Sequence, residues 1–332
     1  MKKFLLVILS VIFLGIGLLF GARLFLGWND GMRHPRSEIH TASLDQKLYI
    51  AGGIGLFKVL DSCETFDLST QNWSDCGILP RALHHVAMAA DGQHVYASGG
   101  YVSLPFQADL KAGLFRYDLP SKSWSEISKL PHPIGQHAMV HFDGDLYLIG
   151  GQNNGADLDS LWHYDIAKDH WSALPPMPVA RHSHAIARDG PYLYVTGGRN
   201  AQDGTEMQRI DSYHLIDNQW SRLPDMPVGR AGHGAFTSNG KLHIFGGEAL
   251  SENKVLDDHM ILDLQSGEWT SAPRLLQPRH GFAVSDVKIG NEIVIVGGGA
   301  RAGLETIFSV TGTVQMLNLQ RKIKGLEKSP EK

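Results

Sequence analysis

Arginine and histidine recur along this chain at matching positions. Five arginines open short segments of similar sequence, and in several segments a histidine follows three residues later. The arginines are Arg36, Arg81, Arg181, Arg230 and Arg279, and the histidines are His84, His137, His184 and His233. A guanidinium group pairs with a carboxylate or phosphate through two parallel hydrogen bonds. If the fold gathers these side chains, we expect them to bind an acidic small molecule, a glycan or an acidic peptide.

The four histidines could also hold a metal ion, because neutral imidazole is a common ligand of zinc and copper. Each histidine comes from a different segment, however, and no cysteine or carboxylate shares their position in the segments. We therefore expect neither a metal ion nor another cofactor.

One carboxylate could take part in acid–base chemistry. Glu248 directly follows a diglycine, and the residues at the equivalent position elsewhere are Ile54, Tyr101, Gln152, Arg199 and Gly299. A glutamate beside several arginines can act as a general acid or base if burial raises its pKa toward neutrality. We expect Glu248 to be a catalytic candidate and Arg199 to belong to the ligand site.

A repeat of about fifty residues supplies the elements that must position these side chains. Diglycines begin at positions 52, 99, 150, 197, 246 and 297, and each ends a short run rich in β-branched and aromatic residues. Such runs are typical of β-strands. Asp-Gly or Asn-Gly dipeptides precede four of these runs, and they favour the tight turn of a β-hairpin. Each repeat therefore predicts antiparallel strands.

Most repeats end with a tryptophan that follows an aromatic or apolar residue, an acidic residue and a turn. One example is Tyr117-Asp118-Leu119 before Trp124. Four strands per unit at this period are typical of a kelch blade. Over about residues 24–319 the chain resembles the kelch-repeat proteins. The resemblance implies an all-β fold, a six-bladed kelch β-propeller.

In such a blade the start of strand one, the end of strand two and the loop after it lie at the same end. We therefore expect the arginines, the histidines, Arg199 and Glu248 to surround one mouth of a central channel, open to solvent and framed by the longer loops. The alternative follows from the Arg-x-Gly-His segments of kelch blades. There, each arginine would pair with a neighbouring blade and each histidine would bond to backbone.

The sixth repeat lacks a tryptophan and a fourth strand at its C-terminal end. Residues 28–36 match residues 73–81 in length and in the positions of Trp, Asp, Pro and Arg. We expect a strand from about Leu24 to Asn29, carrying Trp28, to complete the last blade and leave the ring without an open edge. The propeller would then cover residues 23–319, followed by a flexible tail at 320–332.

Residues 1–22 have the pattern of a membrane segment. Lys2 and Lys3 precede an apolar run of nineteen residues from Phe4 to Ala22. A spanning helix needs about twenty residues, and the lysines favour a cytoplasmic N-terminus. We expect residues 4–22 to contact the membrane as a signal anchor or signal peptide. The propeller would then be periplasmic, tethered to the inner membrane or released by cleavage.

The two cysteines of the chain are Cys63 and Cys76, and we expect them to form a disulfide between neighbouring strands of an exported domain. The chain has 30 Lys and Arg against 34 Asp and Glu, which gives a formal net charge of −4. This balance provides no strongly basic surface, so we do not expect nucleic acid as a partner.

A second, narrower resemblance concerns activity. Gly247-Glu248-Ala249 with Lys254 looks like a segment of the bacterial sialic-acid mutarotases, in which an arginine stands in place of Lys254. This resemblance implies a mutarotase or epimerase acting on a sugar acid, with Glu248 and Lys254 as the catalytic pair. Ligand binding without chemistry and a protein-interaction scaffold of the cell envelope are the other two possibilities.

Overall fold

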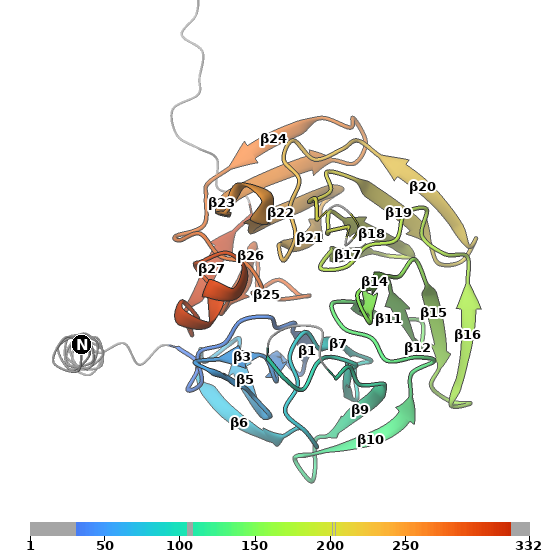
Figure 1. The fold of residues 1–332 in the computed structure, drawn as a ribbon, viewed down its shortest axis with the longest axis vertical. Helices are drawn as coiled ribbons and strands as arrows, with labels where there is room; N and C mark the ends of the chain where they lie inside the picture. Colours follow the sequence, from blue (N-terminus) through green and yellow to red (C-terminus); the bar gives the residue numbers. More distant parts are fainter. Residues whose placement is uncertain (1–30, 105–108, 201, 203, 320–332) are drawn as a thin grey trace, which may run out of the picture. The chain divides into compact units, whose positions relative to one another are not determined.

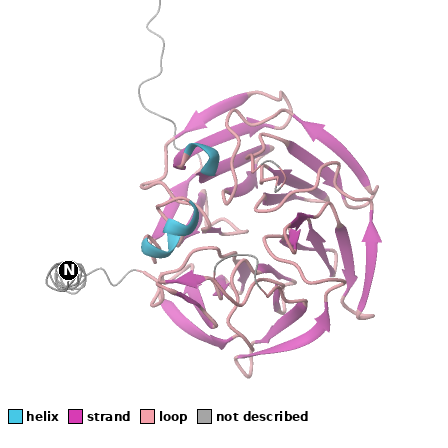
Figure 2. Ribbon diagram, in the orientation of Figure 1, coloured by secondary structure: helices cyan, strands magenta, loops and turns pink. Residues whose placement is uncertain are grey.

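The structure is a computed structural model, and it describes residues 31–104, 109–200, 202 and 204–319. The part from Met32 onward is one compact unit, a ring of six β-blades (Figure 1). Among the described residues of this unit, helix is confined to two short 3-10 segments, η1 (Leu250–Glu252) and η2 (Gly303–Phe308), coloured cyan in Figure 2. The predicted all-β, six-bladed propeller is confirmed.

Each of the first five blades is a four-stranded antiparallel sheet. Blade one contains β1 (Ala42–Leu44), β2 (Lys47–Ala51), β5 (Ser62–Asp67) and β6 (Trp73–Ile78). Blade two contains β7 (Ala87–Ala90), β8 (Val95–Ser98), β9 (Gly113–Asp118) and β10 (Ser123–Lys129). Blade three contains β11 (Ala138–Phe142), β12 (Asp145–Ile149), β15 (Leu161–Asp165) and β16 (His170–Leu174).

Blade four contains β17 (Ala185–Asp189), β18 (Tyr192–Thr196), β19 (Ile210–His214) and β20 (Gln219–Leu223). Blade five contains β21 (Gly234–Ser238), β22 (Lys241–Ala249), β23 (Lys254–Asp263) and β24 (Trp269–Ala272). Among the described residues blade six has three strands, β25 (Ala283–Val284), β26 (Glu292–Val296) and β27 (Val314–Asn318). Two small hairpins, β3 (Ile54–Gly55) with β4 (Lys58–Val59) and β13 (Gln152–Asn153) with β14 (Ala156–Asp157), project from blades one and three.

The core lies between neighbouring blades. The second strand of each blade is covered on both faces, which explains why its sequence is a continuous apolar run instead of an alternating one. In β12, the four residues from Leu146 to Ile149 are all buried. Tyr147 and Ile149 pack with Leu193 and Val195 of the next blade in one apolar cluster.

The diglycine after each second strand is required by close approach of the next blade. Gly151 has a φ of +99°, and its N–H donates to the carbonyl oxygen of Arg181 at 3.0 Å. A Cβ atom at position 151 would lie 2.7 Å from the carbonyl oxygen of Gly135. Only glycine combines this backbone conformation with that contact.

Residues 32–36 close the ring at the end of blade six. The Met32 N–H donates to the carbonyl oxygen of Gly312, just before β27, at 2.9 Å. Leu79 and Met177 make the same bond in their blades, to Asp61 and Asp159. The segment that precedes blade one therefore takes, beside blade six, the place of the residues that follow the outer strand in blades one and three.

The predicted strand at Leu24–Asn29, with Trp28, lies outside the described residues. So do the predicted membrane segment at 1–22 and the tail at 320–332. Among the residues that the structure describes, no helix has the length and apolar character to cross a membrane.

The predicted disulfide is confirmed. Cys63 on β5 and Cys76 on β6 are bonded, with a Cα–Cα distance of 4.9 Å. The pairing of Phe66 with Trp73 and of Glu64 with Asp75 sets the register that brings the two cysteines opposite each other.

Candidate functional site

One backbone bond defines equivalent positions at the start of strand one in every blade. The N–H of the second glycine of each diglycine donates to the residue that begins this segment in the next blade. The six acceptors are Arg36, Leu83, Ile134, Arg181, Arg230 and Arg279. Arg81 was expected at this position, but Leu83 occupies it, so the alignment of Arg81 was wrong by two residues. Arg81 is exposed and lies 3.5 Å from Glu126.

The four remaining arginines do not form a cationic rim. Arg36, Arg181, Arg230 and Arg279 are at most 1% exposed. Three of them pair with carboxylates on the third strand of the same blade that they begin, Arg36 with Glu64, Arg181 with Asp211 and Arg230 with Asp258. Arg279 donates to the Thr313 hydroxyl at 3.2 Å, and burial lowers its pKa to about 10.

The prediction of a rim of arginines open to solvent is therefore wrong. A buried guanidinium needs a partner because desolvation without one is costly. The alternative that each arginine connects neighbouring blades holds in a modified form, because the backbone carbonyl bonds to the preceding blade while the side chain bonds within its own blade.

Two of the four predicted histidines join neighbouring blades. His137, His184 and His233 stand three residues after the defining position, where blade two has Val86 instead of the predicted His84. His137 Nε2 lies 2.8 Å from the Ser98 hydroxyl, and His233 Nε2 lies 2.8 Å from that of Thr196.

These three histidines are neutral near pH 7. Burial lowers the pKa of His137 to about 3 and holds the pKa values of His184 and His233 well below the usual range. They therefore add no positive charge to the channel.

His184 lacks the partner that its counterparts have. Both of its ring nitrogens are buried without a hydrogen bond among the described residues. Ile149 stands where Ser98 and Thr196 provide hydroxyls, directly before the diglycine. A buried polar group without a partner costs stability.

We expect Ile149→Thr to be more stable than the isosteric Ile149→Val by about 1 kcal/mol, because only threonine offers a hydroxyl to His184. Urea unfolding of both variants measures this difference. The same comparison in a His184→Phe background should show no advantage for threonine. Equal stability of the two variants in the native background would contradict the assignment.

A ring of six residues surrounds the channel mouth, two positions after the defining residue. Their φ angles lie between +52° and +58°. The mouth ring consists of Glu38, His85, Gln136, Ser183, Gly232 and Gly281, and all six line a central channel of about 430 Å³. Backbone bonds link neighbouring members, for example from Gly281 N–H to the Gly232 carbonyl oxygen at 2.8 Å.

Four blades place a residue with a polar side chain at this position, although glycine adopts the left-handed backbone there at a lower free-energy cost. A left-handed backbone costs an ordinary residue roughly 1–2 kcal/mol, and blades five and six use Gly232 and Gly281 there. Strained residues of this kind concentrate at functional sites. The mouth ring is therefore the strongest candidate for a ligand site. The sequence pattern does not single it out, because its residue type differs from blade to blade whereas arginine and histidine recur on either side of it.

Glu38 and two histidines form a chain of polar contacts in the mouth ring. Glu38 Oε2 lies 2.9 Å from His85 Nε2, and His85 Nδ1 lies 2.7 Å from His84 Nδ1. His84 Nε2 donates to the carbonyl oxygen of Ser103 at 3.0 Å. Burial alone would raise the pKa of Glu38, but the nearby histidines, above all His85, lower it to about 2. Burial lowers the pKa of His84 to about 3.

The ends of this chain of contacts indicate which groups donate. His84 is neutral, and its Nε2 donates to the carbonyl oxygen of Ser103. Glu38 is ionised and only accepts, so the His85 nitrogen that faces it donates to it. The mouth therefore holds an imidazole that donates to a largely enclosed carboxylate.

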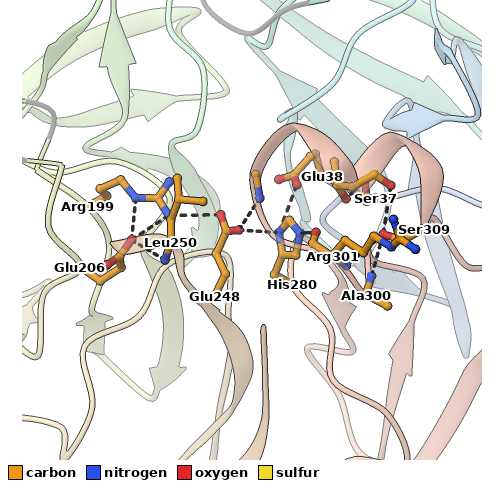
Figure 3. A network of polar contacts seen from close by, with 12 residues as sticks. Ser37, Glu38, Arg199, Glu206, Glu248, Leu250, His280, Ala300, Arg301 and Ser309 are labelled. Atoms are coloured by element: carbon orange, nitrogen blue, oxygen red, sulfur yellow. Dashed lines mark hydrogen bonds and ion pairs between the residues drawn. The ribbon is translucent and has the colours of Figure 1, made fainter. Parts of the chain in front are cut away.

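Glu248 and Arg199 lie together beside the mouth ring, as Figure 3 shows. Arg199 Nη2 lies 3.1 Å from Glu248 Oε1 and 3.0 Å from Glu206 Oε1. Glu248 Oε2 also accepts from the Gly303 N–H at 3.0 Å and lies 3.7 Å from His280 Nδ1. Glu248 is 7% exposed and is not among the residues that line the channel.

These carboxylates hold loops in place. Glu206 accepts from the Leu250 N–H at 2.9 Å and from the Ser251 hydroxyl at 2.7 Å. Together with the bond from Glu248 to Gly303, this joins the loops of blades four, five and six above the channel.

The structure does not bring Lys254 to Glu248. In the β22–β23 ladder Glu248 pairs with Val255, and Lys254 pairs with Ala249. Successive residues of a strand point to opposite faces, so the two side chains lie on opposite faces of the hairpin. Lys254 is exposed, and the predicted catalytic pair is not assembled. Arg199 is the cation that contacts Glu248 instead.

Across the described ranges of the chain, no three His, Cys, Asp or Glu side chains come together in a group that could hold a metal ion.

The six antiparallel blades, their diglycines and their blade-joining arginines define a kelch-type β-propeller. Residues 95–300 match the family described as the Attractin/LZTR1 β-propeller, and the chain belongs to this family. The solved structure of YjhT is similar, with a TM-score of 0.74 at 17% identity over 88% of this chain and 97% of that one, which shows a shared fold.

Curated relatives match over shorter stretches. Kelch-like protein 34 of Homo sapiens is 38% identical over 80 residues, which are 23% of this chain and 12% of the relative. Kelch-like protein terF of Aspergillus terreus is 26% identical over 132 residues, which are 37% of this chain and 28% of the relative. The chain thus spans only a small part of the length of these relatives.

Proposed function

We propose that the mouth ring binds a small, hydroxyl-rich ligand, a sugar or the end of a glycan. The observation that carries this proposal is the use of Glu38, His85, Gln136 and Ser183 in a strained conformation at one mouth. Their carboxylate, imidazole, amide and hydroxyl groups are suited to bonding with sugar hydroxyls. The channel volume of about 430 Å³ lies in the range of small-molecule sites.

Charge does not favour a strongly acidic ligand. An acidic ligand was predicted from the recurring arginines, but four of them are buried and bond to groups within the propeller. Arg199 already contacts two carboxylates. We therefore expect binding of a neutral sugar or of a sugar with a single negative charge, with weak dependence on salt.

Gln136→Gly should remove binding while leaving the propeller as stable as before or more stable by about 1 kcal/mol, because glycine relieves the left-handed strain. Calorimetric titration with neutral and acidic saccharides and thermal unfolding measure the two effects.

Lys122→Gly is the matched control, because Lys122 has a φ of +51° in an exposed hairpin turn away from the channel. It should gain stability in the same way and keep full binding. Unchanged binding in Gln136→Gly would overturn the proposed site.

Acid–base chemistry on a sugar is a second candidate, favoured by the contacts from Glu38 through His85 to His84. Opening a sugar ring requires one proton to leave a hydroxyl and another to reach the ring oxygen. An imidazole that donates beside an ionised carboxylate supplies both kinds of group. The resemblance to sialic-acid mutarotases supports this activity, although the pair proposed is Glu38 and His85, not Glu248 and Lys254.

Anomer exchange followed by NMR separates the two assignments. Glu38→Gln should stop exchange, whereas Glu248→Gln should preserve it. Loss of exchange only in Glu248→Gln would return the catalytic role to that residue.

We also propose that the protein is exported and held at the membrane by residues 4–22. The Cys63–Cys76 disulfide supports export, because such bonds persist in oxidising compartments.

A further inference from the structure

An exposed apolar patch lies on the loops around the channel mouth. Leu56, Phe57 and Phe308 are 55%, 60% and 60% exposed, and these three residues are here called the apolar patch. The two phenylalanine rings meet edge to face, with centroids 5.2 Å apart. An apolar cluster that is turned outward on a folded surface marks a contact site.

The backbone conformation that exposes this patch is energetically unfavourable at Phe57. Phe57 has a φ of +58° at the tip of the β3–β4 hairpin, a conformation that is rare for a bulky residue. Leu56 and Phe57 are the two residues between the paired ends of that hairpin, and Phe308 ends η2 on blade six. Both elements are loops after a second strand, so they lie at the same end of the ring as the mouth ring.

The patch lies close to the point where the chain enters the propeller. Met32 bonds to Gly312, only four residues after Phe308. Nine residues, 23–31, separate Met32 from the apolar run that ends at Ala22. Even fully extended, this link reaches only about 30 Å.

Charged residues near the patch suit a phospholipid surface. Lys58, which directly follows Phe57, is exposed, and Arg301, just before η2, is 62% exposed and lies 3.6 Å from Glu305. Aromatic and aliphatic side chains next to basic ones are typical of protein surfaces that lie in the membrane interface.

We propose that the apolar patch docks onto the phospholipid bilayer to which the N-terminal segment tethers the chain. The tether supplies proximity, and the patch sets orientation, with the channel mouth facing the membrane. This proposal rests on the proposed membrane tether at residues 4–22 and is independent of which ligand the mouth ring binds.

The test uses the full chain, reconstituted in vesicles of phosphatidylethanolamine and phosphatidylglycerol, with an environment-sensitive fluorophore on a single introduced cysteine. The native cysteines are bonded to each other and do not react. Glu305→Cys places the reporter on η2 beside the patch, and Asp217→Cys places the control in a hairpin turn at the opposite end of blade four. The two acidic residues are 69% and 66% exposed.

An interfacial apolar group enters the headgroup boundary by about 5–10 Å, so nitroxides on the upper acyl chain should quench the reporter at 305 and not the one at 217. Adding Leu56→Ser, Phe57→Ser and Phe308→Ser to the reporter at 305 should abolish quenching.

Three outcomes would overturn the proposal. One is equal quenching at both positions, and another is quenching that survives the serine changes, because the tether alone would then explain it. The third is shielding of the reporter at 305 in lipid-free micelles that increases with protein concentration, which would identify a second copy of the chain as the occupant.

Discussion

Asp211→Ala should destabilise the propeller by about 3–5 kcal/mol, the usual cost of leaving a buried charge without its partner. Arg181 and Asp211 are both 0% exposed and contact each other in blade four, while the Arg181 carbonyl oxygen accepts from Gly151 of blade three. Arg209 also donates to Asp211, at 2.7 Å from both Nε and Nη2. Removal of this carboxylate therefore affects two guanidinium groups, one of them fully buried. Urea unfolding of the variant measures the loss.

Two variants test the cause. Asp258→Ala should cost less, because the Asp258 side chain is 26% exposed and water can reach the site. Arg181→Ile combined with Asp211→Leu should regain much of the lost stability, since Ile134 occupies the equivalent place in blade three. If Asp211→Ala costs under about 1 kcal/mol, the pair does not hold the blades together in the way proposed.

The free energy of unfolding should be constant above about pH 6.5 and fall steeply as the pH drops toward 4. Burial lowers the pKa of His137 and His259 to about 3 and of His243 to about 4. The unfolded chain takes up these protons near pH 6.5, whereas the folded chain does not. The unfolded state thus binds more protons in this window, and each such histidine removes about 1.4 kcal/mol per pH unit.

Calorimetry at pH 7.5, 6 and 5 measures this effect as a fall in Tm. Glu38 acts in a different window, because a carboxyl with a folded pKa of about 2 loses its stabilising contribution only below about pH 4.5. His137→Phe should reduce the slope by one proton. A Tm that stays the same from pH 7.5 to 5 would show that these imidazoles are not neutral and buried together.

The fold was predictable because its signals are local and repeated. Diglycines recur in all six blades, tryptophans at the outer strand in five, and Asp-Gly or Asn-Gly turns in four. The register that joins Cys63 to Cys76 follows from one hairpin. An error in the alignment of one repeat therefore does not change the predicted fold.

The site was less predictable because its determinants are distant in sequence. The partner of Arg181 lies thirty residues further on, at Asp211, and only the packed blades reveal it. In blade two, a shift of two residues moved Arg81 and His84 into positions that belong to Leu83 and Val86. The sequence does contain an indication of the mouth ring. Glu38 and Gln136 occupy a position at which blades five and six have glycine, and a polar residue in place of glycine suggests a functional role.

Closure of the ring also sets an order of events during synthesis. Met32 and Gly312, which bond at the seam, are 280 positions apart, and every other blade is made between them. At about 5–20 residues per second, a ribosome needs roughly 15–60 s to make that interval. The segment around Met32 therefore has no partner at the seam until blade six has been synthesised. During that interval this segment is the part of the nascent chain most in need of protection from aggregation.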